Sequence, residues 1–203
     1  MRNAALRASL ALGPRALEHA NSHLSLSHAE RAVDALLGCS GRRWFTGVGK
    51  SGLAAARMAS SLTSIGLPAH WVHGTEWFHG ELGGVGSIDV ITAVSHSGTT
   101  TELLALADML EAHAPDALLI TLTGDACSPL AARAHVPLTA AVPAGSEAVH
   151  DLLPAASVLA AHHVFNALLA ECAARRELTL RDVRRHHPRG HVAARAAAEQ
   201  NSQ

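Results

Sequence analysis

The sequence predicts an α/β fold in which a doubly wound, five-stranded parallel sheet is flanked by helices. Five short runs of apolar or β-branched residues are the first observation, at residues 43–48, 69–73, 89–95, 117–123 and 136–142. Helical stretches lie between them, at residues 50–65, 100–113 and 128–134. Strands that are apolar almost throughout, alternating with helices, are typical of a parallel sheet covered on both faces. Ligands of such sheets bind outside the carboxyl ends of the strands.

Helices are also predicted before and after this alternating region. Residues 4–20 and 28–38 have amphipathic patterns, and Ser27 with Glu30 three residues later predicts an N-cap for the second helix. Residues 148–175 predict one long apolar helix, and a basic helical tail follows, interrupted by Pro188 and Gly190. We therefore expect an N-terminal helical arm (1–40), a ligand-binding domain (41–195) and a C-terminal tail (196–203).

Composition limits the classes of function. Of the 203 residues, 48% are hydrophobic and 16% charged, and the net charge is −1, so we expect a folded globular protein. This charge gives no reason to expect a nucleic-acid or membrane partner, and no apolar run reaches membrane-spanning length. The three cysteines form no CxxC pattern, which predicts buried, reduced thiols and a cytoplasmic protein.

The turn "TGVGKSGL" (residues 46–53) follows the first predicted strand and contains Lys50, the only lysine beside fifteen arginines. A nucleotide-binding P-loop would need glycine where Trp44 stands, and no acidic residue ends the 69–73 run as a dinucleotide site requires. The turn instead brings backbone amides, Lys50 and Ser51 to a helix N-terminus, which suits a small anion. A plain strand-to-helix turn is the alternative.

A second polar loop, "SHSGTTTEL" (residues 95–103), follows the third predicted strand. Hydroxyl groups surround Gly98, from Ser95, Ser97, Thr99, Thr100 and Thr101. Hydroxyls and amides at the positive end of a helix suit a phosphate monoester, whereas an ordinary N-cap would explain only one or two of them. Glu102 is either a first-turn partner of the helix dipole or a catalytic carboxylate pointing at the ligand.

Together the motifs resemble the sugar isomerase (SIS) domain, and within it the arabinose-5-phosphate isomerase branch. The resemblance rests on "GVGKSG", "VHGTEWFHGELG", "SHSGTTTE", "GSEAVHDLLP" and "HHPRGHVAAR", in this order over residues 28–195. It ends before the paired CBS domains that many members of the branch carry. It implies the phosphosugar-binding fold and a homo-oligomer, which we expect to be a tetramer or dimer.

The resemblance also implies roles for individual residues. The implied catalytic side chains are Lys50, Glu102, Glu147 and His187. The implied substrate contacts are Gly49, Ser51, His79, Ser95, Ser97, Gly98, Thr99 and Thr100. His73 matches a position that can hold an inhibitory or adventitious zinc ion, and no cofactor is required. Glu147 precedes the predicted long helix, so a capping role is its alternative.

The implied activity is aldose–ketose isomerisation of D-arabinose 5-phosphate and D-ribulose 5-phosphate through an enediol. The alternatives are an isomerase of a hexulose or heptulose phosphate, and a sensor that binds a sugar phosphate without turning it over. The chain departs from the branch at His96, which is usually Asn, at Thr99, which is usually Glu or similar, and at Arg189, which is usually Gly. Trp77 and Phe78 either belong to the core or a subunit contact, or narrow the sugar pocket.

Overall fold

A computed structural model of the chain describes residues 3–200 and contains the predicted five-stranded, all-parallel sheet. The strand order is β2-β1-β3-β4-β5. The strands are β1 (Arg43–Gly47), β2 (His70–His73), β3 (Val90–Ser95), β4 (Leu118–Thr123) and β5 (Val136–Thr139). Each lies within its predicted run, and β1 and β3 are buried along their whole length.

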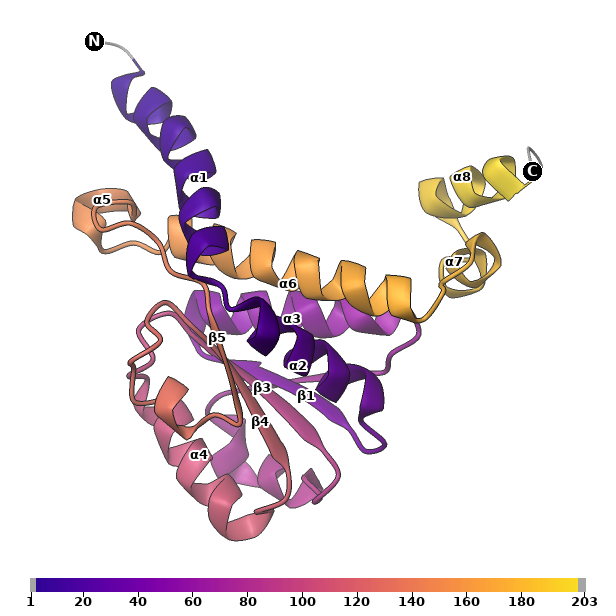
Figure 1. Cartoon of the computed structure of the whole chain (residues 1–203), viewed down its shortest axis with the longest axis horizontal. Coiled ribbons are helices and arrows are strands. Elements are labelled where there is room, and N and C mark those ends of the chain that lie inside the picture. Colours follow the sequence, from indigo (N-terminus) through magenta and orange to yellow (C-terminus); the bar gives the residue numbers. More distant parts are fainter. Residues whose placement is uncertain (1–2, 201–203) are drawn as a thin grey trace.

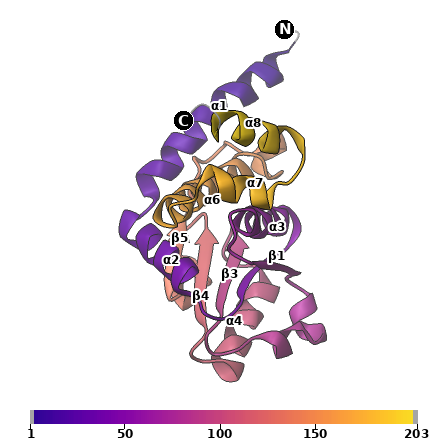
Figure 2. The ribbon, with the colours of Figure 1, turned by 90° about the vertical axis from the view of Figure 1, so that its right-hand side faces the viewer.

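Helices cover both faces of this sheet (Figures 1 and 2). The α-helices are α1 (Ala4–His23), α2 (Leu26–Gly38), α3 (Gly49–Ser64), α4 (Thr101–His113), α5 (Ala148–Asp151), α6 (Ala156–Arg175), α7 (Leu180–His186) and α8 (Gly190–Gln200). Three short 3₁₀ helices are η1 (Glu76–His79), η2 (Glu81–Gly84) and η3 (Ala131–Arg133).

Two apolar clusters correspond to the two faces of the sheet. The larger joins α2, α3 and α6 to one face around Phe45 and Phe165, whose rings meet edge to face at 6.4 Å. The smaller joins α4 to the other face around Trp44 and Trp77. Trp77 is buried and its indole N–H donates to Thr46 Oγ1 at 2.8 Å, so it is a core residue, as one of the two interpretations predicted. Phe78 is exposed.

The first two helices differ in detail from the sequence prediction. The first extends to His23, and the N-cap of α2 is Ser25, whose side chain accepts from the backbone N–H of His28. The expectation that Ser27 is the cap was therefore wrong. A cap must have an extended backbone, and the chain leaves α1 in that conformation two residues earlier.

The single helix predicted over residues 148–175 is two helices. Pro154 follows the four-residue α5, and α6 begins at Ala156. Within α5 the backbone is itself irregular, because Val149, His150 and Asp151 have φ of 46°, 56° and 61°. An apolar pattern does not reveal such a break, because apolar residues continue on both sides of it.

Helix α6 is, in the described range 3–200, the one helix long and apolar enough to cross a membrane by length and composition. Of that stretch 44% is buried inside the protein, where α6 packs against α1, α2 and α3. Its apolar character is thus that of a core helix.

The predicted boundary at residue 40 does not coincide with a gap in the packing, and the one at residue 195 falls inside α8. Ala16 and Ala20 of α1 and Leu36 of α2 are buried, and both helices contact α6. Only the first half of α1 projects from the body (Figure 1), and Leu6 and Leu10 there are 58% and 68% exposed. Residues 1–2 of the predicted arm and 201–203 of the predicted tail lie outside the described part of the chain.

The three thiols are free but not equally buried. Cys172 is fully buried in α6, and burial raises the pKa of its thiol to about 11. Cys39 is half-buried, whereas Cys127 is exposed. The expectation that all three are buried was therefore wrong for Cys127, which lies in the loop after β4 rather than in a regular element.

Candidate active site

The candidate site lies at the carboxyl edge of the sheet, at the end of β1 and β3. From β1 the chain crosses to β2 on one side and then returns to β3 on the other. The loops after β1 and β3 therefore diverge, and a crevice opens between them. Lys50 and Ser51 follow β1, and the hydroxyl-rich loop follows β3.

The turn after β1 depends on glycines. A Cβ at Gly47 would lie 2.9 Å from the backbone N of Gly52, and a Cβ at Gly52 would lie 2.7 Å from the carbonyl of Gly47. Gly49 has a left-handed φ of 58°. This close approach places Lys50 and Ser51 in the first turn of α3. Lys50 is exposed and has no hydrogen bond or ion pair within residues 3–200, so its ammonium is available to a ligand.

The loop after β3 is organised by its own hydroxyls. Ser95 is buried; its Oγ lies 2.8 Å from Thr100 Oγ1 and accepts from the backbone N–H of Gly98. Ser97 Oγ accepts from the backbone N–H and the hydroxyl of Thr99. Ser95 thus shapes the loop, while Ser97 and Thr99 form its exposed rim.

Two further glycines join this loop to the rest of the sheet edge. Gly98 has φ 63°, and a Cβ there would lie 2.2 Å from Ser128 Oγ. Gly124, after β4, donates its N–H to the carbonyl of His96 at 2.8 Å. A Cβ at Gly124 would lie 2.4 Å from the His96 ring, so the imidazole rests on a backbone that carries no side chain.

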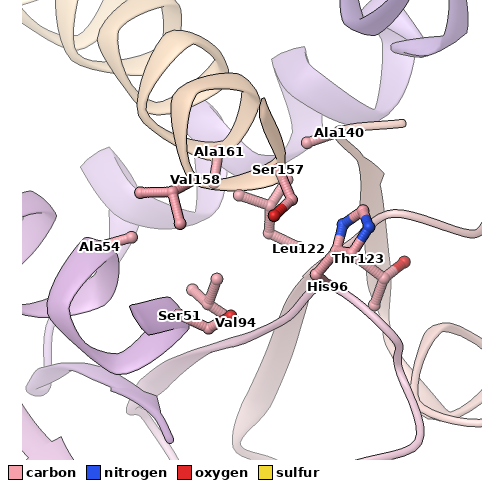
Figure 3. Close-up of a pocket in the computed structure, with 10 residues that line it drawn as sticks. All are labelled: Ser51, Ala54, Val94, His96, Leu122, Thr123, Ala140, Ser157, Val158 and Ala161. Carbon is pink, nitrogen blue, oxygen red and sulfur yellow. The ribbon is translucent and has the colours of Figure 1, made fainter. Parts of the chain in front are cut away.

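A cleft lies between the N-terminal ends of α3 and α6, above β3 and β4 (Figure 3). Its inner part is lined by Ala54, Val94, Leu122, Thr123, Ala140, Val158 and Ala161, together with Ser51, His96 and Ser157. The last three residues also line an adjoining hollow of about 260 Å³, whose other walls include Glu147, Asp151 and Pro154. We call the two parts together the α3–α6 cleft.

Glu147 is at the rim of this cleft, and its carboxylate caps α6. One oxygen accepts from the backbone N–H of Ser157 at 3.0 Å and the other from that of Ala155. The capping alternative is thus confirmed by these contacts, and the same side chain lines the hollow. A carboxylate is well placed there, because the N-terminal end of a helix is partly positive.

Asp151 holds the segment that carries Glu147. Its carboxylate accepts from the backbone N–H groups of Glu147 at 2.8 Å and Gly145 at 2.9 Å. These two hydrogen bonds lower the pKa of Asp151 below its ordinary value, with a smaller contribution from the nearby His96. The carboxylate therefore remains charged at neutral pH and joins the two ends of the 145–151 segment.

The remaining predicted residues lie at different distances from the cleft. Glu102 is half-buried in the first turn of α4, accepting from the Thr101 hydroxyl at 3.0 Å. His73 ends β2 beside Gly47 in the sheet, and His79 is exposed at the end of η1. His187 follows α7, at the far end of α6 from α5 (Figure 1). A 20-residue helix is about 30 Å long, so one chain does not bring His187 to the cleft.

The surroundings of His73 do not fit a permanent zinc site. Its Nδ1 lies 2.8 Å from the Thr75 hydroxyl. Within residues 3–200 no three His, Cys, Asp or Glu side chains come together as a metal site requires.

Among the cleft residues that were not predicted as site residues are His96, Asp151 and Ser157. His96 was noted only as a departure from the family pattern, although its place in the polar loop was a sufficient signal. Asp151 was hidden inside an expected helix. Ser157 is buried at the start of α6, and no sequence pattern marks it.

Comparison with known proteins relates this site to sugar-phosphate proteins. The SIS domain model matches residues 36–171. Arabinose 5-phosphate isomerase KpsF of Escherichia coli is 30% identical over 190 residues, which are 94% of this chain and 57% of the relative. Arabinose 5-phosphate isomerase KdsD of Pseudomonas aeruginosa is 35% identical over 166 residues, 81% of this chain and 50% of the relative. The chain thus spans about half the length of the curated relatives it matches.

Solved structures of similar fold also include sugar-phosphate proteins. An Escherichia coli CFT073 protein in complex with A5P superposes with a TM-score of 0.84 and 30% identity, covering 93% of this chain and all of that one. The sugar isomerase domain of an RpiR transcription factor from Sphaerobacter thermophilus, 20% identical with a TM-score of 0.72, shares the fold. The family model covers most of the described sheet and helices, and the chain belongs to the SIS domain family.

Proposed function

We propose that the chain is an aldose–ketose isomerase that interconverts D-arabinose 5-phosphate and D-ribulose 5-phosphate. The observation that carries the proposal is that Ser51 and Glu147, more than ninety residues apart, line one hollow at the carboxyl edge of the sheet. Relatives named arabinose 5-phosphate isomerase support the choice of substrate. The hollow of about 260 Å³ suits a small ligand.

The phosphate is proposed to bind where the loop after β3 meets the helix starts. Backbone amides at the start of α3 and α4, with the hydroxyls of Ser51, Ser97, Thr99 and Thr100, supply donors without opposing charge. Gly49 and Gly98 let the backbone reach the phosphate, and His79 reaches it from η1. Anchoring this end fixes the position of C1 and C2 at the other end of the sugar.

The proton transfer is assigned to a carboxylate. Glu147 removes the proton from C2 of the aldose and returns it to C1, while the hydroxyl proton moves from O2 to O1. Glu102 shuttles that hydroxyl proton or orients the sugar. Lys50 stabilises the negative charge that develops on the enediolate oxygen. Because the Glu147 carboxylate caps α6, this role requires the 147–155 segment to rearrange when the sugar binds.

A second copy of the chain is proposed to complete the site. His187 opens the sugar ring or polarises its carbonyl, and it lies too far from the cleft of its own chain to do so. The projecting half of α1, with exposed Leu6 and Leu10, suits a subunit contact in a dimer or tetramer. We propose a cytoplasmic enzyme with no required cofactor, at which zinc near His73 is adventitious.

The test is proton exchange followed by NMR, with D-ribulose 5-phosphate in D₂O. Isomerisation through an enediol places deuterium from solvent at C2 of the arabinose phosphate and at C1 of the ribulose phosphate. Glu147→Gln is expected to lower the exchange rate by at least about a thousandfold, because an amide cannot accept the proton. Hexulose and heptulose phosphates run in parallel identify a different sugar if one of them exchanges faster.

A sensor that binds a sugar phosphate without turnover is the second candidate. The engagement of the Glu147 carboxylate in the α6 cap favours it. Saturable binding of the sugar phosphates with no deuterium incorporation by the wild type would establish the sensor and eliminate the isomerase.

A further inference from the structure

We propose that His96 is a further substrate-contacting residue, whose imidazole donates a hydrogen bond to a sugar oxygen in the α3–α6 cleft. The inference rests on the proposed function for the nature of the ligand. The position of the side chain follows from geometry alone. The resemblance to the isomerase branch assigns no role to this position and expects Asn there.

The imidazole lies at the junction of the two parts of the cleft. His96, Ser51 and Ser157 are the only residues of the described chain that line both parts. In Figure 3 the ring projects from the loop after β3 beside Thr123 and Ser157. The inner part has a volume of only about 10 Å³, so a ligand occupies the adjoining hollow, where it lies beside both the imidazole and Glu147.

The position of the His96 ring is defined by its contacts with Gly124. Its own backbone carbonyl is tied to the N–H of Gly124, and the absence of a side chain at Gly124 leaves the space that the ring occupies. A Cβ at Gly124 would lie 2.4 Å from both Cε1 and Nδ1 of the ring. Gly124 thus supports a particular position of the imidazole.

The polar atoms of the ring are available. Within residues 3–200 neither ring nitrogen of His96 has a hydrogen-bond partner, and the side chain is exposed to the cleft. A neutral imidazole always carries one N–H donor and one acceptor. A sugar presents hydroxyl and carbonyl oxygens that match both.

The carboxylates beside the His96 ring indicate which part of the ligand the ring contacts. Asp151 is close enough for its carboxylate and the ring to interact electrostatically, and Glu147 lines the same hollow. With two carboxylates on the rim beside it, the ring is better placed to contact neutral sugar oxygens than to bind the phosphate.

The experiment compares four proteins: wild type, His96→Ala, His96→Gln and His113→Asn. Ala removes the hydrogen bond, whereas Gln restores a donor of similar reach. His113 is exposed in the last turn of α4 and is the matched control. KM and kcat for D-ribulose 5-phosphate are measured, together with the NMR signal of the His96 Cε1 proton on addition of D-arabinose 5-phosphate. The signal is assigned by its absence in His96→Ala.

His96→Ala is expected to raise KM roughly tenfold, which is the size of one lost hydrogen bond. His96→Gln recovers at least half of this loss on a logarithmic scale, and His113→Asn is unchanged. The His96 signal shifts with the same saturation curve as ligand binding. An unchanged KM in His96→Ala, or a His96 signal that does not move while others do, overturns the proposal.

Failure of the proposed function looks different. If the wild type binds D-arabinose 5-phosphate and the His96 signal shifts, but no deuterium is exchanged, then the contact stands and the isomerase does not. If exchange is fast while the His96 signal does not move, then the isomerase stands and the contact does not. Wild type that binds none of the sugar phosphates overturns both.

Discussion

The proposed role of Lys50 can be tested by a single substitution. It is the only lysine, and its exposed ammonium at the start of α3 has no partner in the described residues 3–200. If charge alone matters, arginine replaces it. If a compact ammonium must reach one enediolate oxygen, the larger planar guanidinium does not.

We expect Lys50→Arg to lower kcat by at least about a hundredfold, since a preorganised charge at the developing oxyanion is lost. The melting temperature should stay the same, because the side chain is exposed. Arg57→Lys, two turns along α3, is the control and should retain full turnover. Retained turnover in Lys50→Arg would reduce the role of Lys50 to charge.

Asp89 shows the opposite case, a buried charge that serves stability. Its carboxylate accepts from the backbone N–H groups of Arg42 and Gly86 and from the Trp44 indole, at 2.7–3.0 Å. Burial by itself would raise the pKa of Asp89, but the hydrogen bonds from Arg42, Gly86 and Trp44 together lower it. The residue lies just before β3, at the edge of the sheet opposite the cleft.

Asp89→Asn is expected to lower the free energy of unfolding by about 1–3 kcal/mol at pH 7, because the NH₂ group of the Asn side chain would face one of the N–H groups that now donate to the carboxylate.

The pKa of Asp89 is lower in the folded state than in the unfolded state. The stabilisation by Asp89 is therefore complete above about pH 4 and is lost as the pH falls through the folded-state pKa. Urea unfolding should therefore show the difference between wild type and variant shrinking below pH 4. A difference that stays constant down to the acid transition contradicts this account, and exchange activity at pH 7 is expected to be unaffected.

At the scale of elements, the loop after β3 is fixed to the loop after β4. Leu130 donates its backbone N–H to the carbonyl of Gly98, and Ser128 lies directly against the Gly98 Cα. The hydroxyl-rich loop therefore takes its shape from contacts outside itself as well as from its own serines.

Gly98→Ala is expected to destabilise the fold by at least about 2 kcal/mol, from a left-handed alanine and its overlap with Ser128. Ser128→Gly removes the overlap, so the double variant should lose less stability than the sum of the two single variants. Gly83→Ala is the control, because a Cβ there meets nothing within 4 Å and the backbone is not left-handed. Additive effects measured by urea unfolding would show that the overlap is relieved in another way.

Much of this element-level picture could be predicted from sequence. The five strands follow from local apolar runs, and the two polar turns after β1 and β3 contain Gly49 and Gly98, which have positive φ in the structure. The break between α5 and α6 could not be predicted in the same way. The positive-φ residues of α5 that precede the break are not glycines, and the Asp151 carboxylate bonds back to the backbone N–H groups of Gly145 and Glu147. The cap at Ser25 instead of Ser27 is a two-residue difference that local propensity does not resolve.

The site itself was predictable where residues share a local motif and not where tertiary packing places them. Ser51 and His96 of the loop after β3 line the same cleft because parallel strands end at one edge. Ser157 enters the cleft only because α6 packs across the sheet. The separation of His187 depends on the path of α6 over its whole length.

For the whole molecule, the position of His187 predicts complementation between subunits. If each site takes Lys50 from one chain and His187 from another, Lys50→Ala and His187→Ala are both inactive alone. After mixing, unfolding and refolding together, half of the dimers are mixed and each has one intact site. We expect about a quarter of the wild-type exchange rate. No recovery, with mixed oligomers confirmed by native mass spectrometry, would place both residues in the site of one chain. Full activity of His187→Ala alone would remove His187 from the site.

The hydroxyls of the loop after β3 already bond to one another, Ser95 with Thr100 and Ser97 with Thr99. The conformational entropy of this loop is therefore lost when the protein folds, not when a ligand arrives. A phosphate entering the loop exchanges one set of hydrogen bonds for another and orders little new backbone. Association can then be fast and weakly temperature-dependent, and the free energy of binding is left to the contacts that distinguish one sugar from another.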